Sequence, residues 1–127
     1  MREIIFRGKR FDNGEWVYGY YQRVLRPNDT FVHIIHSVQI KTVESDADMP
    51  VSFLVDPATV GQYTGLKDKK DKKIFEGDVL NTNGAITVIE WRTPYFVGFQ
   101  FIKGKFNQAQ AEIIGNVYDN PELMKGR

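Results

Sequence analysis

Runs of apolar and β-forming residues alternate with short turn sequences along the whole chain. In the first half these runs predict strands over residues 3–10, 16–21, 30–40, 51–55 and 59–66. The first two runs flank Asp12-Asn13-Gly14 and predict an N-terminal hairpin. The stretch of residues 44–50 is acidic and rich in turn formers, so we expect an exposed loop there.

The second half contains the clearest local signal of a hairpin. Asp78–Thr82 and Ala85–Trp91 flank Asn83-Gly84, the pair that a two-residue type I′ turn prefers. Further strands are expected over residues 95–102 and 112–118. Antiparallel pairing of successive strands is therefore predicted for most of this half.

The fold class follows from these patterns. Asn120 and Pro121 suit the N-cap and first positions of a short C-terminal helical turn. The strand over residues 85–91 carries apolar residues on both faces, which favours a barrel or a sandwich. We expect a mainly β protein of about eight or nine short strands, with a small barrel-like or sandwich fold of one or two sub-barrels.

The length of 127 residues is that of one domain. We therefore expect a single domain, 1–127. Residues 67–73 are seven consecutive charged residues and form the plausible joint if the domain divides into two subdomains. These subdomains would cover about residues 1–66 and 74–127.

Composition limits the classes of partner. Seventeen basic and sixteen acidic residues give a net charge of +1, which provides no long-range field toward nucleic acids or anionic membranes. No cysteine is present, which excludes disulfides, thiolate metal sites and cysteine nucleophiles. The sequence has no apolar run of membrane-helix length and no signal-peptide pattern at its N-terminus. We expect a protein of the cytoplasm without a membrane partner.

The charged run is the sharpest candidate for a binding site. It contains five lysines that are suited to contact phosphates, namely Lys67, Lys69, Lys70, Lys72 and Lys73. Two aspartates, Asp68 and Asp71, interrupt the run, and a mixed charged loop is also typical of a solvated connection. Just before it, Gln62 and Tyr63 either face a ligand or anchor a glycine-rich segment of the fold.

Candidate metal and catalytic groups are sparse. His33 and His36 lie three residues apart, so in a regular strand they point to opposite faces. The alternating acids Glu44, Asp46 and Asp48 lack the glycine and the closing glutamate of a calcium loop. We expect no metal and no cofactor.

A carboxylate pair is the remaining catalytic candidate. Glu76 and Asp78 could share one face of a strand, as alternate residues do. The sequence contains no phosphate-binding glycine loop of the Walker type and no Gly-x-Ser-x-Gly elbow. A small hydrolase or nuclease is therefore the least favoured class.

Two longer segments carry a family resemblance. Residues 59–68, with the sequence TVGQYTGLKD, and residues 74–79, with the sequence IFEGDV, resemble the YopX family of phage and prophage proteins. The start of the chain, residues 5–10, and its end, residues 113–123, also look like the termini of that family. The resemblance implies a phage or prophage origin, a largely β fold and homo-oligomerisation. It implies no established activity and no catalytic residues.

These observations lead to an ordered set of functional hypotheses. The first is a phage accessory protein of the bacterial cytoplasm that self-assembles and binds a protein or nucleic-acid partner. The alternative is a nucleic-acid-binding regulator that uses the loop of residues 67–73. The third is a metal-dependent hydrolase or nuclease that uses Glu76 or Asp78.

Overall fold

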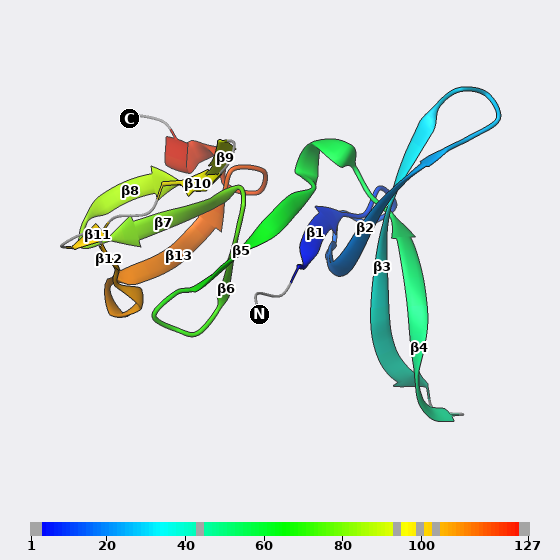
Figure 1. Cartoon of the computed structure of the whole chain (residues 1–127), viewed down its shortest axis with the longest axis horizontal. Helices are drawn as coiled ribbons and strands as arrows, with labels where there is room; N and C mark the ends of the chain where they lie inside the picture. Colours follow the sequence, from blue (N-terminus) through cyan, green and yellow to red (C-terminus); the bar gives the residue numbers. More distant parts are fainter. Residues whose placement is uncertain (1–3, 43–44, 93–94, 99–100, 103–104, 125–127) are drawn as a thin grey trace. The chain divides into compact units, whose positions relative to one another are not determined.

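The computed structural model describes residues 4–42, 45–92, 95–98, 101–102 and 105–124 (Figure 1). The chain divides into two compact units. The N-terminal unit is Ile4–Gln62, and the C-terminal unit contains Tyr63–Arg127. Each unit is described separately below.

The N-terminal unit is an antiparallel sheet. Its elements in chain order are β1 (Phe6–Lys9), β2 (Trp16–Leu25), β3 (Phe31–Thr42), β4 (Ser45–Leu54), the 3-10 helix η1 (Pro57–Thr59) and the start of β5 (Gly61–Lys67). The spatial order of the strands is β4-β3-β2-β1-β5. The pair Lys9↔Trp16 begins the ladder of β1 and β2, so the predicted N-terminal hairpin is confirmed.

The longest ribbon of this unit is the β3–β4 pair (Figure 1). Its register includes Val38↔Pro50 and Thr42↔Ser45, and it shifts near Lys41. The prediction of a loop over residues 44–50 is therefore wrong from Ser45 onward. A neighbouring strand supplies hydrogen-bond partners for this backbone, and such pairing outweighs the weak β preference of the acidic residues.

The core of the N-terminal unit lies on one face of the sheet. Val17, Ile35 and Val55 are buried, and Ile35 and Val55 are fully so. The partly buried side chains around them are Phe6, Tyr21, Phe53 and Val60. Burial of a side chain such as Ile35 stabilises the fold by about 1.5–3 kcal/mol.

The C-terminal unit is built from short strands. After the end of β5 come β6 (Lys73–Phe75), β7 (Asp78–Thr82), β8 (Ala85–Val88), β9 (Glu90–Arg92), β10 (Tyr95–Val97), β11 (Phe101–Ile102), β12 (Lys105–Phe106), η2 (Gln108–Gln110), β13 (Ala111–Asn116) and η3 (Pro121–Met124). A three-stranded sheet has the order β13-β7-β8. The pairs β9–β10 and β11–β12 are short hairpins, and β5 pairs with β6.

The β7–β8 hairpin confirms the strongest local prediction. Thr82 pairs with Ala85, and Asn83 and Gly84 have φ values of 51° and 91°. Positive φ at both central residues is the requirement of a type I′ turn. The strand predicted to run to Trp91 is interrupted at Ile89, whose N–H donates to the carbonyl of Asp78 at 2.9 Å. Local turn chemistry therefore set the hairpin, and packing of the fully buried Ile89 set where its second strand ends.

The second core belongs to the C-terminal unit alone. Ile74, Leu80 and Ile89 are fully buried, and the half-buried side chains packed on them are Leu66, Phe96, Phe106 and Ile113. The helical turn η3 begins at Pro121, as predicted. In the described residues no helix is long and apolar enough to cross a membrane.

The prediction of a mainly β fold is confirmed. The strands of the described residues form several antiparallel sheets and do not close into a barrel.

Candidate interaction sites

Asp68 is the structural centre of the charged run. Its side chain is fully buried, although Lys69 and Lys70 beside it are exposed. Oδ1 accepts hydrogen bonds from the N–H groups of Lys70 and Lys72, both at 2.9 Å, and Oδ2 accepts one from Ile113 at 3.1 Å. Burial raises the pKa of Asp68, but the backbone donors Ile113, Lys72 and Lys70 outweigh it and hold the pKa below its ordinary value of 3.8.

The backbone of the run is also tied to its surroundings. The N–H of Lys69 donates to the carbonyl of Ala111 at 2.8 Å, and Nε2 of Gln108 donates to the carbonyl of Asp68 at 2.9 Å. The N–H of Asp68 donates to the carbonyl of Lys72 at 2.9 Å and closes the loop. The run therefore lies inside the C-terminal unit as an anchored turn between β5 and β6.

Three of the five lysines face carboxylates. Nζ of Lys70 lies 3.0 Å from Oε2 of Glu112, and Nζ of Lys69 lies 3.8 Å from Oε1 of the same side chain. Nζ of Lys67 lies 3.9 Å from Asp71. The hydrogen bond to Glu112 raises the pKa of Lys70, and the hydrogen bond from Lys70 lowers the pKa of Glu112. Much of the positive charge that the sequence places here is compensated locally.

The other two lysines have different surroundings. Lys72 is exposed, and Nζ of Lys73 lies 5.7 Å from the centre of the Tyr63 ring. That distance is within the range of a cation–π contact.

Gln62 and Tyr63 differ in burial and belong to different units. Tyr63 is 4% exposed, and its ring centre lies 5.6 Å from that of Phe75. Gln62 is half-buried and pairs with Phe6 in the β1–β5 ladder. The neighbouring Thr64 is buried and donates its hydroxyl to the carbonyl of Ile74 at 2.8 Å. Tyr63 and Thr64 are therefore packing residues of the C-terminal unit.

The two histidines have separate hydrogen-bond partners. The ring of His33 stacks on Tyr21, and its Nδ1 lies 2.5 Å from the tyrosine hydroxyl. The ring of His36 bridges Gln22 and Ser52, each at 2.8 Å. These contacts keep neighbouring strands of the N-terminal sheet in register.

The two candidate catalytic carboxylates, Glu76 and Asp78, have different surroundings. Asp78 is 2% exposed and accepts a hydrogen bond from the N–H of Phe75 at 2.7 Å, whereas Glu76 is half-buried. Glu44 and the side chains of Asp46 and Asp48 lie outside the described residues. Within the described residues, no group of three or more histidine and acidic side chains is placed to hold a metal ion.

Sequence reasoning did not locate the exposed apolar surface in the N-terminal unit. Eight of the described large hydrophobic side chains are exposed, and seven belong to this unit, namely Ile4, Phe11, Tyr18, Tyr20, Leu25, Phe31 and Leu54. The eighth is Trp91 of the C-terminal unit. The alternation of residues in β2 carries part of this signal, because Tyr20 falls on the same face of the strand as Gln22 and on the opposite face from Val17. Both faces carry apolar residues, so the sequence does not show which face is covered.

The register places part of this set on one face of the sheet. Tyr20 is paired with His36, which is paired with Ser52, and Ile34 is paired with Leu54. These positions are offset by one residue from Ile35, so they lie on the face opposite the core. We call the side chains of Tyr20, Gln22, Ile34, His36, Ser52 and Leu54 the outer face of the N-terminal sheet.

Comparison with known proteins agrees with the β architecture and the family motifs. The sequence model of a family described as YopX protein matches residues 5–125. The chain belongs to the YopX family. This confirms the resemblance over nearly the whole chain, from the start at residues 5–10 through residues 59–68 and 74–79 to the end at residues 113–123.

The YopX chain is also similar to a solved structure, the crystal structure of protein EF1440 from Enterococcus faecalis. The TM-score is 0.59 at 19% sequence identity, over 98% of this chain and 100% of that one. At this identity the likeness shows a shared fold. No curated protein matches the sequence of the YopX chain.

Proposed function

We propose that this YopX protein is a phage or prophage accessory protein that self-assembles through its N-terminal unit in the bacterial cytoplasm. The observation that carries the proposal is the concentration of exposed apolar side chains in that unit. Single exposed apolar residues are ordinary, but a gathering of them marks an interaction surface. Tyr20 and Leu54, on the same outer face, are 67% and 48% exposed.

A shallow hollow at the β4 end of the same unit adds a second feature suited to an interface. It has a volume of about 220 Å³ and is lined by Arg10, Phe11, Asp12, Ser52, Phe53 and Leu54. Phe11 is 68% exposed at its rim, and the guanidinium of Arg10 covers the Phe53 ring at 4.6 Å. Interfaces commonly bind an aromatic or aliphatic anchor of the partner in such a hollow.

Charge permits two copies of this unit to meet. Residues 4–62 contain six basic and seven acidic residues, so two copies repel each other weakly. A two-fold interface uses the same patch on both subunits, and a unit of nearly neutral charge suits that arrangement. We therefore propose a second copy of this chain as the occupant of the surface.

The experiment is size-exclusion chromatography with light scattering on the untagged protein. The expected mass is a whole multiple of 14.7 kDa at micromolar concentration. Combined replacement Tyr20→Ser and Leu54→Ser should reduce the mass to that of one chain, because it removes apolar area from the outer face. Trp91→Ser is the matched control, since it removes an exposed aromatic from the other unit. A monomeric wild-type protein would refute self-assembly.

The same chromatography, with absorbance recorded at 260 and 280 nm, also tests the nucleic-acid alternative. If the loop of residues 67–73 binds nucleic acid, the purified protein carries excess 260 nm absorbance that high salt removes. Replacement of Lys69, Lys70, Lys72 and Lys73 by alanine should then abolish that absorbance. The fold should survive the change, since the groups that hold Asp68 are backbone N–H groups. A protein-like absorbance ratio at low salt favours the protein-binding proposal.

A further inference from the structure

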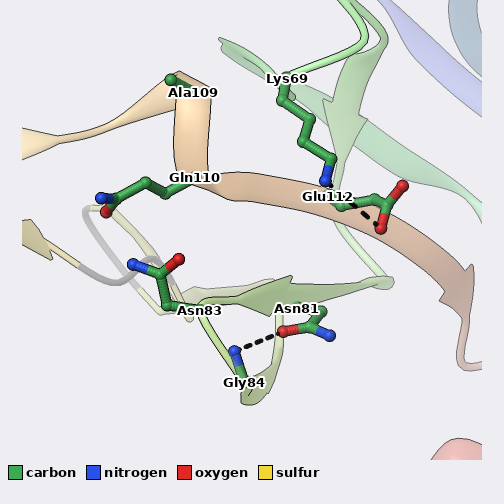
Figure 2. Close-up of a pocket in the computed structure, with 7 residues that line it drawn as sticks. All are labelled: Lys69, Asn81, Asn83, Gly84, Ala109, Gln110 and Glu112. Carbon is green, nitrogen blue, oxygen red and sulfur yellow. Dashed lines mark hydrogen bonds and ion pairs between the residues drawn. The ribbon is translucent and has the colours of Figure 1, made fainter.

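Two hollows of the described residues differ in what lines them. The hollow of the C-terminal unit is lined mainly by polar side chains, and its Lys69 lies 3.8 Å from Glu112 (Figure 2). The hollow at the β4 end of the N-terminal unit is lined by the apolar side chains of Phe11, Phe53 and Leu54 and by an ion pair. Of the two, the second offers the apolar surface that a protein partner covers.

Phe11 stands at the end of a short ladder beside β4. Its N–H donates to the carbonyl of Leu54 at 3.3 Å, and the N–H of Asp56 donates to the carbonyl of Lys9 at 2.9 Å. The chain then turns at residues 12–14 and enters β2, so this segment leaves β4 directly after Phe11. The Phe11 side chain is 68% exposed, the largest value among the exposed large hydrophobic side chains of the described residues.

Arg10 gives the hollow a flat wall. Its Nε donates to Oδ1 of Asp12 at 2.9 Å and its Nη2 donates to Oδ2 at 2.5 Å, and these two bonds fix the plane of the guanidinium. One face of that plane covers the Phe53 ring at 4.6 Å. A guanidinium stacks on aromatic faces, so its other face suits a second ring. Because Asp12 compensates the charge of Arg10, the hollow suits an uncharged aromatic side chain.

The position of Phe11 at the rim of its own hollow selects the partner. In a two-fold pair both subunits present the same patch, so an anchor beside a pocket on one copy meets the same pocket on the other. Tyr20 and Phe31 are also exposed, but neither lines the hollow. An anchor distant from the pocket would produce a head-to-tail contact, which does not close a pair. A reciprocal exchange of Phe11 satisfies both the anchor and the hollow.

We propose that Phe11 of each copy occupies the hollow of the other, with its ring stacked on the guanidinium of Arg10 and packed against Leu54. This inference rests on the proposed self-assembly through the N-terminal unit and names the contact by which two copies meet. The contact adjoins the outer face of the N-terminal sheet, because Ser52 and Leu54 belong to both that face and the hollow.

The test is sedimentation equilibrium of the full-length protein, which measures the dissociation constant of the pair. Phe11→Ala removes the anchor, and Ser52→Glu places a charged side chain in the hollow, where an aromatic ring would have to desolvate it. Either variant loses both contacts of the pair. Each should raise the dissociation constant by about a hundredfold, about tenfold for each buried anchor that is lost. Both residues are exposed, so both variants should fold.

An equimolar mixture of the two variants is the decisive sample. Phe11 of the Ser52→Glu copy still fits the hollow of the Phe11→Ala copy, so the mixed pair regains one of the two contacts. Its dissociation constant should lie about tenfold above that of the wild type and about tenfold below that of either variant alone. Loss of the fold or a general loss of apolar surface would not be repaired by mixing.

Phe31→Ala is the matched control. Phe31 is an exposed phenylalanine of the same unit, and the guanidinium of Arg23 covers its ring at 4.2 Å, but it lies outside the hollow. This variant should leave the dissociation constant unchanged. Circular dichroism verifies the fold of every variant.

The possible failures are distinguishable. A wild-type pair that persists in both Phe11→Ala and Ser52→Glu would overturn this inference and leave self-assembly standing. A mixture that associates no better than either variant alone would also overturn the reciprocal contact. A monomeric wild-type protein would overturn the self-assembly proposal itself, and this inference with it.

Discussion

At the scale of single residues, Asp68 decides how the charged run is held. Five of its neighbours in the run are lysines whose side chains are exposed or half-exposed. The aspartate points inward, where its two oxygens accept three backbone hydrogen bonds. A buried carboxylate is tolerated only with such donors, so the three bonds and the burial require one another. The loop is consequently ordered by an acid rather than by its lysines.

Replacing this carboxylate gives a test with a defined pH dependence. Asp68→Asn should lower the free energy of unfolding near neutral pH by about 2–3 kcal/mol, because the amide cannot accept on both atoms. The folded pKa of Asp68 lies below 3.8, so its carboxylate stabilises the protein fully above that value. This contribution is lost as the pH falls below 3.8 through the folded pKa. Urea unfolding near neutral pH and again below pH 3.8 measures the difference in free energy of unfolding between the variant and the wild type.

Asp71→Asn is the control for that prediction. Asp71 is an exposed acid of the same run with φ of 64°, a conformation that asparagine also adopts. This change should leave stability nearly unaltered at either pH. The explanation fails if the two variants are equally destabilised, or if the deficit of Asp68→Asn persists unchanged in acid.

At the scale of elements, β2 pairs with two different strands along its length. Its first residues, up to Gly19, pair with β1, and its residues from Tyr20 pair with β3. The change of partner occurs at Gly19, where φ is 157°. An added Cβ would lie 2.1 Å from the carbonyl oxygen of His36, so only glycine permits this approach of the backbones.

Substitution of Gly19, where β2 changes partner, should destabilise the protein far more than substitution of Gly14 in the preceding turn. Gly19→Ala should destabilise the protein by more than about 2 kcal/mol, because backbone must shift to relieve the contact. Gly14→Ala is the matched control: φ is 72°, but no atom lies within 4 Å of its added Cβ. It should cost about 1 kcal/mol, the strain of positive φ alone. Chemical unfolding followed by circular dichroism compares them, and equal losses would contradict the steric explanation.

At the scale of the whole molecule, the chain contains two cores. Val17, Ile35 and Val55 form one, and Ile74, Leu80 and Ile89 form the other. The unit boundary at Gln62 and Tyr63 precedes the charged run. We propose that the two units are separate subdomains of one YopX domain.

Cavity-creating variants test the independence of the two units. Ile35→Ala and Leu80→Ala should each destabilise their own unit by about 2–5 kcal/mol, since both side chains are fully buried. Amide hydrogen exchange should accelerate over residues 4–62 in the first variant and over residues 63–127 in the second. If either change accelerates exchange equally throughout the chain, the molecule unfolds as one cooperative unit.

Local sequence was sufficient for features that depend on adjacent residues. Asn83-Gly84 specifies its turn because these two residues reach positive φ at low cost, and Pro121 begins η3 because its φ is already helical. The prevalence of β-branched and aromatic residues determined the mainly β class. The family motifs over residues 59–79 were likewise readable from the chain.

Tertiary structure alone decided features that depend on distant partners. Residues from Ser45 to Pro50 form a strand because β3 lies beside them. Asp68 is buried because Ile113, 45 residues away, donates to it. The burial of Tyr63 against Phe75 arises in the same way. A turn is set by the dihedral preferences of two residues, whereas burial and hydrogen-bond satisfaction depend on which segments meet in space.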